Sequence, residues 1–124
     1  PTVTLAHAAV VSALDFARGR DTIVMTALDF PSVRYAVDAM AARLGARVVV
    51  VEGEPDGLSV REDAICAAID ERTALVAVSH VLFRSAHVLD AARLVQHAHA
   101  HGALVMLDAY HAVGVLPVDV TALG

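Results

Sequence analysis

Lysine is absent from this sequence of 124 residues, and all nine basic residues are arginines scattered singly along the chain. Acidic residues outnumber them, so the formal net charge is −5 at pH 7. A protein that binds nucleic acid or an anionic membrane surface usually presents a stripe or patch of Lys and Arg. The sequence has no such stripe, and we expect neither partner.

Cysteine is nearly absent as well. The single one, Cys66, excludes an internal disulfide and fits a reducing compartment, so we expect a cytoplasmic protein. No positively charged segment leads into an apolar core near the N-terminus, as it would in a secretory signal peptide. We place Cys66 within a helix, as a small core residue.

Long apolar runs are also missing, although 57% of the residues are hydrophobic. No run approaches the roughly 18 to 20 residues that span a bilayer, so we do not expect a membrane protein. Alanine and valine recur instead in short runs. The valines at 47–51 are typical of a strand buried on both faces.

Several motifs of common enzymes do not occur. The absence of G-x-G-x-x-G and of a phosphate loop disfavours dinucleotides and nucleoside triphosphates. A Ser/His/Asp hydrolase that uses Ser79 or Ser85 is an alternative. It lacks a G-x-S-x-G elbow, and neither serine sits at a tight strand-to-helix turn.

Three histidines, His97, His99 and His101, form an H-x-H-x-H string that could suggest a metal site. On a helix, alternate residues point about 200° apart, so only His97 and His101 share a face. No carboxylate or cysteine joins them at ligand spacing. We therefore expect no metal, and we interpret these histidines as solvated side chains near a helix C-terminus.

Predicted strands alternate with predicted helices along the chain. Strands are expected at 22–26, 47–51, 74–79 and 103–108, and helices at 5–17, 32–44, 59–69 and 89–101. Elements that alternate in this way form a parallel sheet with right-handed crossovers. The sequence predicts one α/β domain over residues 1–124, a three-layer sandwich with a mostly parallel sheet.

Capping residues set the expected starts of the helices. Thr2 or Thr4 can cap the first helix, and Ser32 can cap the second. Ser59 and Glu62 have the S-x-x-E spacing of a capping box, which predicts the start of the third. The first helix is apolar nearly all round, and this pattern predicts that it is buried.

Three polar or aromatic side chains fall at the ends of predicted strands: Phe30, Ser79 and Asp108. Ligands of open parallel sheets bind outside the carboxyl ends of the strands, so we expect the three to lie close together. Asp108 is followed by Tyr110 and His111. By spacing alone, the commoner interpretation of Asp108 is a cap for the next turn. The functional alternative is a carboxylate that pairs with a cation at the carboxyl end of a buried sheet.

Four segments, taken together, resemble a known enzyme family. They are 30–32 (FPS), 79–85 (SHVLFRS), 108–114 (DAYHAVG) and 116–120 (LPVDV). In this order along almost the whole chain, they resemble the class V aminotransferases. That family comprises fold-type I enzymes that use pyridoxal 5′-phosphate (PLP), and it includes kynureninases and cysteine desulfurases. The resemblance implies a fragment of the large domain of such an enzyme.

The resemblance also implies a role for each candidate residue. Asp108 would pair with the protonated pyridine nitrogen of PLP, and Phe30 would stack on the ring. Thr2, at a helix start, would help to hold the phosphate through free backbone N–H groups. Ser79 would contact the cofactor. His111 would lie near the ring hydroxyl, where kynureninases have histidine and cysteine desulfurases usually have glutamine.

Each of these residues also has a plainer interpretation. Phe30 fits an ordinary core aromatic equally well, and Thr2 fits a simple helix cap. Ser79 can satisfy a backbone group at a strand end. A lone histidine such as His111 is more often structural than catalytic, and only its spacing from Asp108 favours a functional role.

The sequence departs from the family pattern at two points. Kynureninases usually have aspartate after Phe-Pro-Ser/Thr, whereas this chain has Val33. The Schiff-base lysine of the family, which lies beyond a segment like 118–124, is not in this chain. The small C-terminal domain of the family is not in it either, and we expect this fragment alone to be inactive.

We therefore expect part of a PLP-dependent enzyme that acts on an amino acid and forms a homodimer. His111 favours a kynureninase-like enzyme that hydrolyses the Cβ–Cγ bond of kynurenine, and Val33 favours another class V aminotransferase or a desulfurase-like enzyme. An alternative of another class is a catalytically inactive PLP-fold module for binding or assembly. A lysine soon after Gly124 would favour the enzyme.

Overall fold

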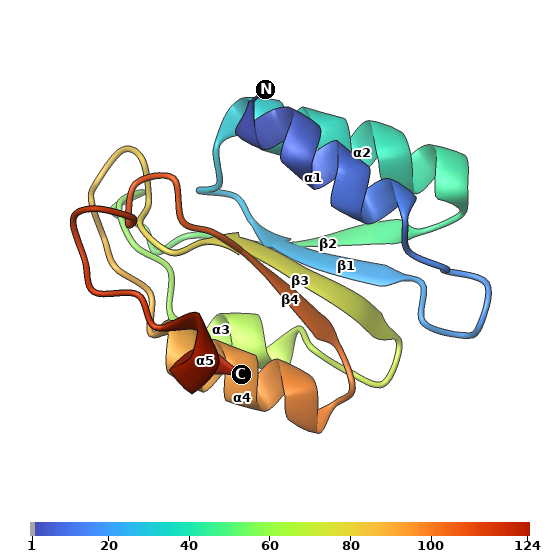
Figure 1. Cartoon of the computed structure of the whole chain (residues 1–124). Helices are drawn as coiled ribbons and strands as arrows, with labels where there is room; N and C mark the ends of the chain where they lie inside the picture. The colour runs from blue at the N-terminus through green and yellow to red at the C-terminus, as the bar shows by residue number, and fades with distance from the viewer. Residues whose placement is uncertain (1) are drawn as a thin grey trace.

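A fully parallel four-stranded sheet forms the centre of the fold, with its strands in the order β2-β1-β3-β4 (Figure 1). The computed structural model describes residues 2–124. The strands are β1 (Thr22–Thr26), β2 (Arg47–Val51), β3 (Thr73–Ser79) and β4 (Leu104–Asp108). They match the predicted strands to within one residue, which confirms the expected parallel sheet.

Helices cover both faces of this sheet. They are α1 (Val3–Ser12), α2 (Pro31–Leu44), α3 (Glu62–Ala67), α4 (Ala91–Ala100) and α5 (Val120–Leu123). Figure 1 shows α1 and α2 on one face and α3, α4 and α5 on the other. The predicted three-layer α/β sandwich is thus confirmed.

The strand order reverses between β1 and β3. From β1, the connection through α2 leads to β2 on one side, and from β3 the connection through α4 leads to β4 on the other. Backbone register between β1 and β3 joins residues 22–24 to residues 73–76 and does not extend to the carboxyl ends. In open α/β sheets, such a reversal point is where ligands bind.

Two hydrophobic cores lie on the two faces of the sheet. Ile23 and Met25 belong to the core on the α1 and α2 side, and Val24 belongs to the core on the α3 and α4 side. All three side chains are fully buried. Burying a side chain of this size contributes about 1.5–3 kcal/mol relative to leaving it exposed. The middle of β1 is therefore apolar and packs against a hydrophobic core on each face of the sheet.

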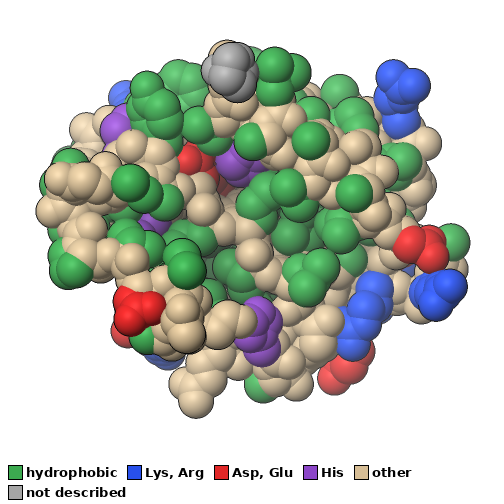
Figure 2. All heavy atoms as spheres, viewed as in Figure 1, with side chains coloured by type: hydrophobic (Ala, Val, Ile, Leu, Met, Phe, Trp, Pro, Cys, Tyr) green, Lys and Arg blue, Asp and Glu red, His purple; other side chains and the backbone are tan. Residues whose placement is uncertain are grey.

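The outer strands are less buried than the sequence predicts. In β2 only Val51 is buried, so the prediction that residues 47–51 are buried on both faces is wrong. In β4, Leu104 is 55% exposed. Both strands are at an edge of the sheet, where a neighbour covers one side alone. Figure 2 shows many hydrophobic side chains on the face viewed in Figure 1.

Helix α1 is shorter and more exposed than predicted. It ends at Ser12, and only His7 and Val11 are buried along it. The prediction of an all-round buried helix is wrong because α1 lies in an outer layer, where one side faces solvent. Its start is as predicted: the Thr2 hydroxyl accepts a hydrogen bond from the backbone N–H of Leu5 at 3.2 Å.

Two predicted caps are wrong. Helix α2 begins at Pro31 with Phe30 at the cap position, because the fixed φ of proline suits the first helical residue. Ser32 lies inside the helix, and its hydroxyl oxygen is 2.8 Å from that of Thr4. The capping box does not form either, because the cap of α3 is Arg61 and makes no side-chain hydrogen bond. The carboxylate of Glu62 instead accepts the N–H of Asp90 at 3.0 Å.

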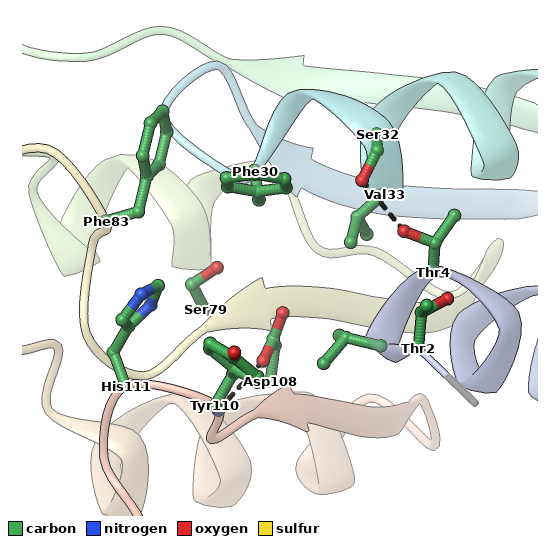
Figure 3. A pocket seen from close by; sticks show the side chains of 11 residues that line it. Thr2, Thr4, Phe30, Ser32, Val33, Ser79, Phe83, Asp108, Tyr110 and His111 are labelled. Carbon is green, nitrogen blue, oxygen red and sulfur yellow. Dashed lines mark hydrogen bonds between the residues drawn. The ribbon is translucent and has the colours of Figure 1, made fainter.

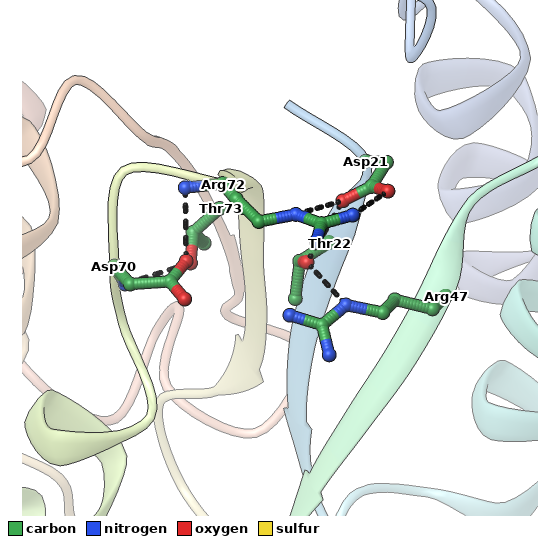
Figure 4. Close-up of polar contacts among 6 residues, drawn as sticks. All are labelled: Asp21, Thr22, Arg47, Asp70, Arg72 and Thr73. Atoms are coloured by element: carbon green, nitrogen blue, oxygen red, sulfur yellow. Dashed lines mark hydrogen bonds and ion pairs between the residues drawn. The ribbon is translucent and has the colours of Figure 1, made fainter. Parts of the chain in front are cut away.

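Charged residues join the strands at the amino end of the sheet (Figure 4). The guanidinium of Arg72 donates to the carboxylate of Asp21 and lowers the pKa of that carboxyl. On the next strand, Arg47 donates from Nε to the hydroxyl of Thr22 at 2.9 Å. The polar side chains at this end of the sheet are therefore hydrogen-bonded to one another.

The side chain of Arg20 lies beside Gly102 at the amino end of the sheet. Arg20 Nη1 donates to the carbonyl oxygens of Thr73 and His101 at 3.0 and 2.9 Å. Gly102 has a φ of +73°, and a Cβ there would lie 2.6 Å from Arg20 Nη2. Gly102→Ala must displace this guanidinium as well as strain the backbone. We expect it to cost about 2–3 kcal/mol of unfolding free energy, as measured by urea denaturation.

Gly45 provides the matched control for this prediction. It also follows a helix in the left-handed region, with a φ of +74°, but a Cβ there would meet nothing within 4 Å. Gly45→Ala should cost only the backbone strain, about 1 kcal/mol. Equal losses in the two variants would contradict the contact with Arg20.

Candidate functional site

One cavity of about 410 Å³ lies at the carboxyl end of the sheet (Figure 3). The residues around it come from the start of α1, the start of α2, the ends of β3 and β4 and the loops that follow them. They are Thr2, Val3, Thr4, Phe30, Ser32, Val33, Ser79, Phe83, Asp108, Tyr110 and His111. All five candidates of the sequence are among them, and the expectation that Phe30, Ser79 and Asp108 lie close together is confirmed. Their roles remain predictions.

Asp108 is the last residue of β4 and lies directly beside Ser79 in the register of β3 with β4. Its side chain is half-buried, and Figure 3 shows the carboxylate pointing into the cavity. Oδ1 accepts the backbone N–H of Tyr110 at 3.0 Å, as a turn cap does. Oδ2 has no hydrogen-bond partner among residues 2–124 and is available to a ligand. The capping and binding interpretations of Asp108 are therefore compatible.

Phe30 and Phe83 form an aromatic wall of the cavity. Their ring centroids are 5.1 Å apart and the planes meet at 76°, an edge-to-face arrangement. Phe30 is 45% exposed, so its interpretation as an ordinary core aromatic is wrong. A ring face that is open to a cavity can stack on a flat ligand.

His111 and Tyr110 lie in the turn that follows β4. Both side chains are exposed, and their rings meet edge to face with centroids 5.1 Å apart. This aromatic contact restrains the imidazole near the mouth of the cavity. His111 can then donate or accept a hydrogen bond to a polar ligand.

The N-terminus of α1 supplies an anion-binding surface to the same cavity. Thr2 caps the helix, while the backbone N–H groups of Val3 and Thr4 make no hydrogen bond among residues 2–124. Free N–H groups at a helix N-terminus, together with the helix dipole, favour a phosphate or carboxylate. A carboxylate, an aromatic wall and a positive helix end therefore surround one space. The arrangement suits a flat, cationic ring that carries an anionic arm.

Asp29 is a site residue that the sequence analysis missed. It is 5% exposed, lies in the loop between β1 and α2, and directly precedes Phe30 of the cavity wall. Oδ2 accepts the N–H and the hydroxyl of Thr26 at 2.8 and 2.9 Å, and Oδ1 accepts the N–H of Ser79 at 2.7 Å. Burial raises the pKa of Asp29, and the hydrogen bonds from Thr26 and Ser79 offset part of that effect. A polar residue just before Phe30 was the available signal.

A second cavity of about 350 Å³ adjoins the first and shares Phe83 and His111 with it. It is lined by Val81, Leu82, Phe83, Ala86, Val88, His111, Val115 and Leu116, and so is almost wholly apolar. The loop after β3 folds back on itself to form one side, through a bridge between Val81 and Val88. An apolar group next to the first cavity would fit there.

Residues 2–124 contain neither a group of metal ligands nor a helix that could span a membrane. Within residues 2–124, no three His, Cys, Asp or Glu side chains are grouped so that they could hold a metal ion. His97 and His101 do share a helix face, with ring centroids 4.5 Å apart. Cys66 is a buried free thiol, as predicted. None of the described helices combines the length and the apolar character needed to cross a membrane.

Comparison with known proteins shows consistent similarities. A family model for class V aminotransferases matches residues 2–124. A kynureninase from Geobacillus thermodenitrificans is 35% identical over 102 residues, which are 79% of this chain and 24% of that protein. A cysteine desulfurase from Escherichia coli is 32% identical over 106 residues, 86% of this chain and 26% of that protein.

A solved structure shows the same fold. It is a C-DES variant with glycine covalently linked to its PLP cofactor, and it has a TM-score of 0.83 and 27% identity. The match covers 98% of this chain and 32% of that one. The chain thus spans about a quarter of the curated relatives and about a third of this structure.

The raised pKa of Asp29 makes a prediction about pH and stability. A carboxyl whose pKa is raised by folding stabilises the fold most when it is protonated, and this contribution is lost as the pH rises through the raised value. Asp29→Asn cannot titrate. From about pH 4 to about pH 7, the unfolding free energy of the wild type should therefore fall relative to that of Asp29→Asn. Urea denaturation at each pH measures both free energies, and a wild type that gains unfolding free energy relative to Asp29→Asn as the pH rises would contradict the burial effect.

Proposed function

This chain belongs to the class V aminotransferase family, and on that premise we propose that it forms the central part of the large domain of a PLP-dependent enzyme that acts on an amino acid. The family is PLP-dependent, and the C-DES structure carries PLP. One observation carries the proposal: a single cavity gathers Thr2, Phe30, Ser79, Asp108 and His111.

The cavity residues fit the chemical groups of PLP. Asp108 directs a carboxylate oxygen without a protein partner into the cavity, which suits a protonated pyridine nitrogen. The free N–H groups of Val3 and Thr4 suit the phosphate. Phe30 exposes its ring beside this space. The volume, about 410 Å³, is in the usual range of small-molecule sites.

When bound, PLP supplies an electron sink that stabilises a carbanion on the substrate. The residues of this chain would prepare it for that task. The carboxylate of Asp108 would hold the proton on the pyridine nitrogen, and Phe30 would keep water from one side of the ring. Ser79 and His111 would form hydrogen bonds to polar groups of the cofactor. The Schiff-base lysine has to come from outside these 124 residues, because they contain none.

Within the family, we propose a kynureninase-like reaction, the hydrolytic cleavage of the Cβ–Cγ bond of kynurenine. His111 stands where kynureninases have histidine. The second, apolar cavity beside His111 has room for an aryl side chain, which the small side chain of cysteine does not require. The 35% identity to a kynureninase is in line with this choice.

Other members of the family are the alternative. Val33 lines the first cavity where kynureninases have aspartate, and this favours another class V aminotransferase or a desulfurase-like enzyme. The 32% identity to a cysteine desulfurase gives the second choice comparable support. A module that binds PLP or assembles without catalysis would lack the lysine in the rest of the protein.

The remaining surface supports a larger assembly. Val113, Val115 and Val120, in the segment that follows β4, are 70–77% exposed, and Leu104, at the amino end of β4, is 55% exposed. Exposed apolar patches of this kind mark interaction surfaces. We propose that the rest of the large domain and the second copy of a cytoplasmic homodimer cover them.

Asp108→Asn tests the proposed partner of the pyridine nitrogen. An amide cannot hold that proton as a carboxylate does, so we expect kcat to fall by about 10²–10³-fold in the protein that carries this segment. Asp38→Asn removes an exposed carboxylate that pairs with Arg34 on α2, and it should leave kcat unchanged. Wild-type kcat in Asp108→Asn would refute the assigned role.

Product analysis tests the reaction. The same protein, supplied with PLP, is given kynurenine, cysteine or alanine in turn, and we expect anthranilate from kynurenine. Sulfide from cysteine in the presence of a thiol reductant, or pyruvate from alanine with a 2-oxo acid as amino-group acceptor, without anthranilate, would instead assign one of the alternatives.

Val88→Asp places a charge in the second cavity and should raise KM for kynurenine about tenfold or more. Val10→Asp, at a similarly exposed valine of α1 outside both cavities, is the control.

A further inference from the structure

We propose that Asp29 is a positioning residue that sets the separation between Phe30 and Asp108, and thereby the width of the cofactor cavity. This inference rests on the proposed function only for what occupies the cavity. Asp29 itself does not line the cavity. It acts through its neighbours, and each link in the chain of contacts is a described hydrogen bond or a peptide bond.

The first link crosses between β1 and β3. Their backbone register ends at Val24 and Val76, well before the residues that border the cavity. Beyond this point, the carboxylate of Asp29 joins Thr26, at the end of β1, to Ser79, at the end of β3. One side chain therefore replaces the missing backbone pairs at the place where the sheet opens.

The second link passes from β3 to β4. Ser79 is the register partner of Asp108, and the N–H of His80 donates to the carbonyl oxygen of Asp108 at 2.9 Å. A shift of the Ser79 backbone therefore moves Asp108 with it. On the other side, Phe30 follows Asp29 directly in the chain. Asp29 is thus connected to both walls of the cavity.

Among the residues that the structure describes, no other side chain hydrogen-bonds the end of β1 to the end of β3. The three donors to the carboxylate are two backbone N–H groups and one hydroxyl, and no arginine contributes to the set. The bond to Ser79, at 2.7 Å, is the shortest of the three. One oxygen of the carboxylate faces β1 and the other faces β3.

The test compares two substitutions on the same network in the full-length protein that carries this chain. Asp29→Ala breaks the links to both strands. Thr26→Val removes the hydroxyl donor on the β1 side, which is also the acceptor for the N–H of Leu28 at 3.3 Å. It leaves the N–H of Thr26 and the bond to Ser79 in place. Both variants lose buried hydrogen bonds and are destabilised, so circular dichroism first fixes a temperature at which both are folded.

The readout is the dissociation constant for PLP, measured by titration of the apoprotein. We expect Asp29→Ala to bind PLP about tenfold or more weakly than the wild type, and Thr26→Val to remain within about twofold. A merely structural role would weaken neither, or would weaken both in proportion to their loss of stability, and either outcome would overturn the proposal. Wild-type protein that binds no PLP would refute the proposed function instead.

Asp29→Asn keeps the test decisive if Asp29→Ala does not fold. Its amide has a single acceptor oxygen, so it can serve either Thr26 or Ser79, and hydrogen exchange at the Ser79 N–H reports which. If Asp29→Asn keeps the exchange protection of the Ser79 N–H, we expect it to keep wild-type PLP affinity. If it loses this protection, we expect it to bind PLP more weakly. Lost protection with wild-type affinity, or kept protection with weakened affinity, would overturn the proposal.

Discussion

The carboxyl ends of β1 and β3 have to be joined without backbone pairs, and the site depends on how this is done. Strand order reverses between them, and their register stops at residue 24 of β1. The buried carboxylate of Asp29 accepts hydrogen bonds from both strand ends. Burial raises the pKa of this carboxyl, and the hydrogen bonds from Thr26 and Ser79 offset part of that effect. Beyond this link, the space at the carboxyl end of the sheet is the cavity that the candidate residues line.

The two ends of the sheet use polar residues in opposite ways. At the amino end, Arg72 and Asp21 satisfy one another, and Arg20 is held by two backbone carbonyl groups. At the carboxyl end, one oxygen of Asp108 and the first N–H groups of α1 are left without partners among residues 2–124. Unsatisfied groups that converge on one space characterise a binding site, whereas mutually satisfied groups stabilise the fold.

Sequence reasoning found the cavity residues whose place can be inferred from a local feature, such as the end of a strand. Asp108, Ser79 and Phe30 follow strands, so the parallel topology alone predicts that they converge. Thr2 joined them only through the resemblance to the family. Sequence reasoning missed Asp29, because its partner Ser79 is 50 residues away and its importance lies in that long-range bond. It also placed the cap of α2 at the wrong residue and expected too much burial for α1 and β2. Burial depends on position in the layers, which periodicity does not specify.

The sequence by itself determined the alternation of strands and helices, the parallel sheet and the family, because these follow from local apolar patterns and short motifs. The tertiary structure alone decided which strands are at the edges, that Phe30 faces a cavity, and that an apolar second cavity adjoins His111. Only the structure showed the link from Asp29 to Ser79. Such contacts join segments distant in sequence, and no local propensity encodes the distance between them.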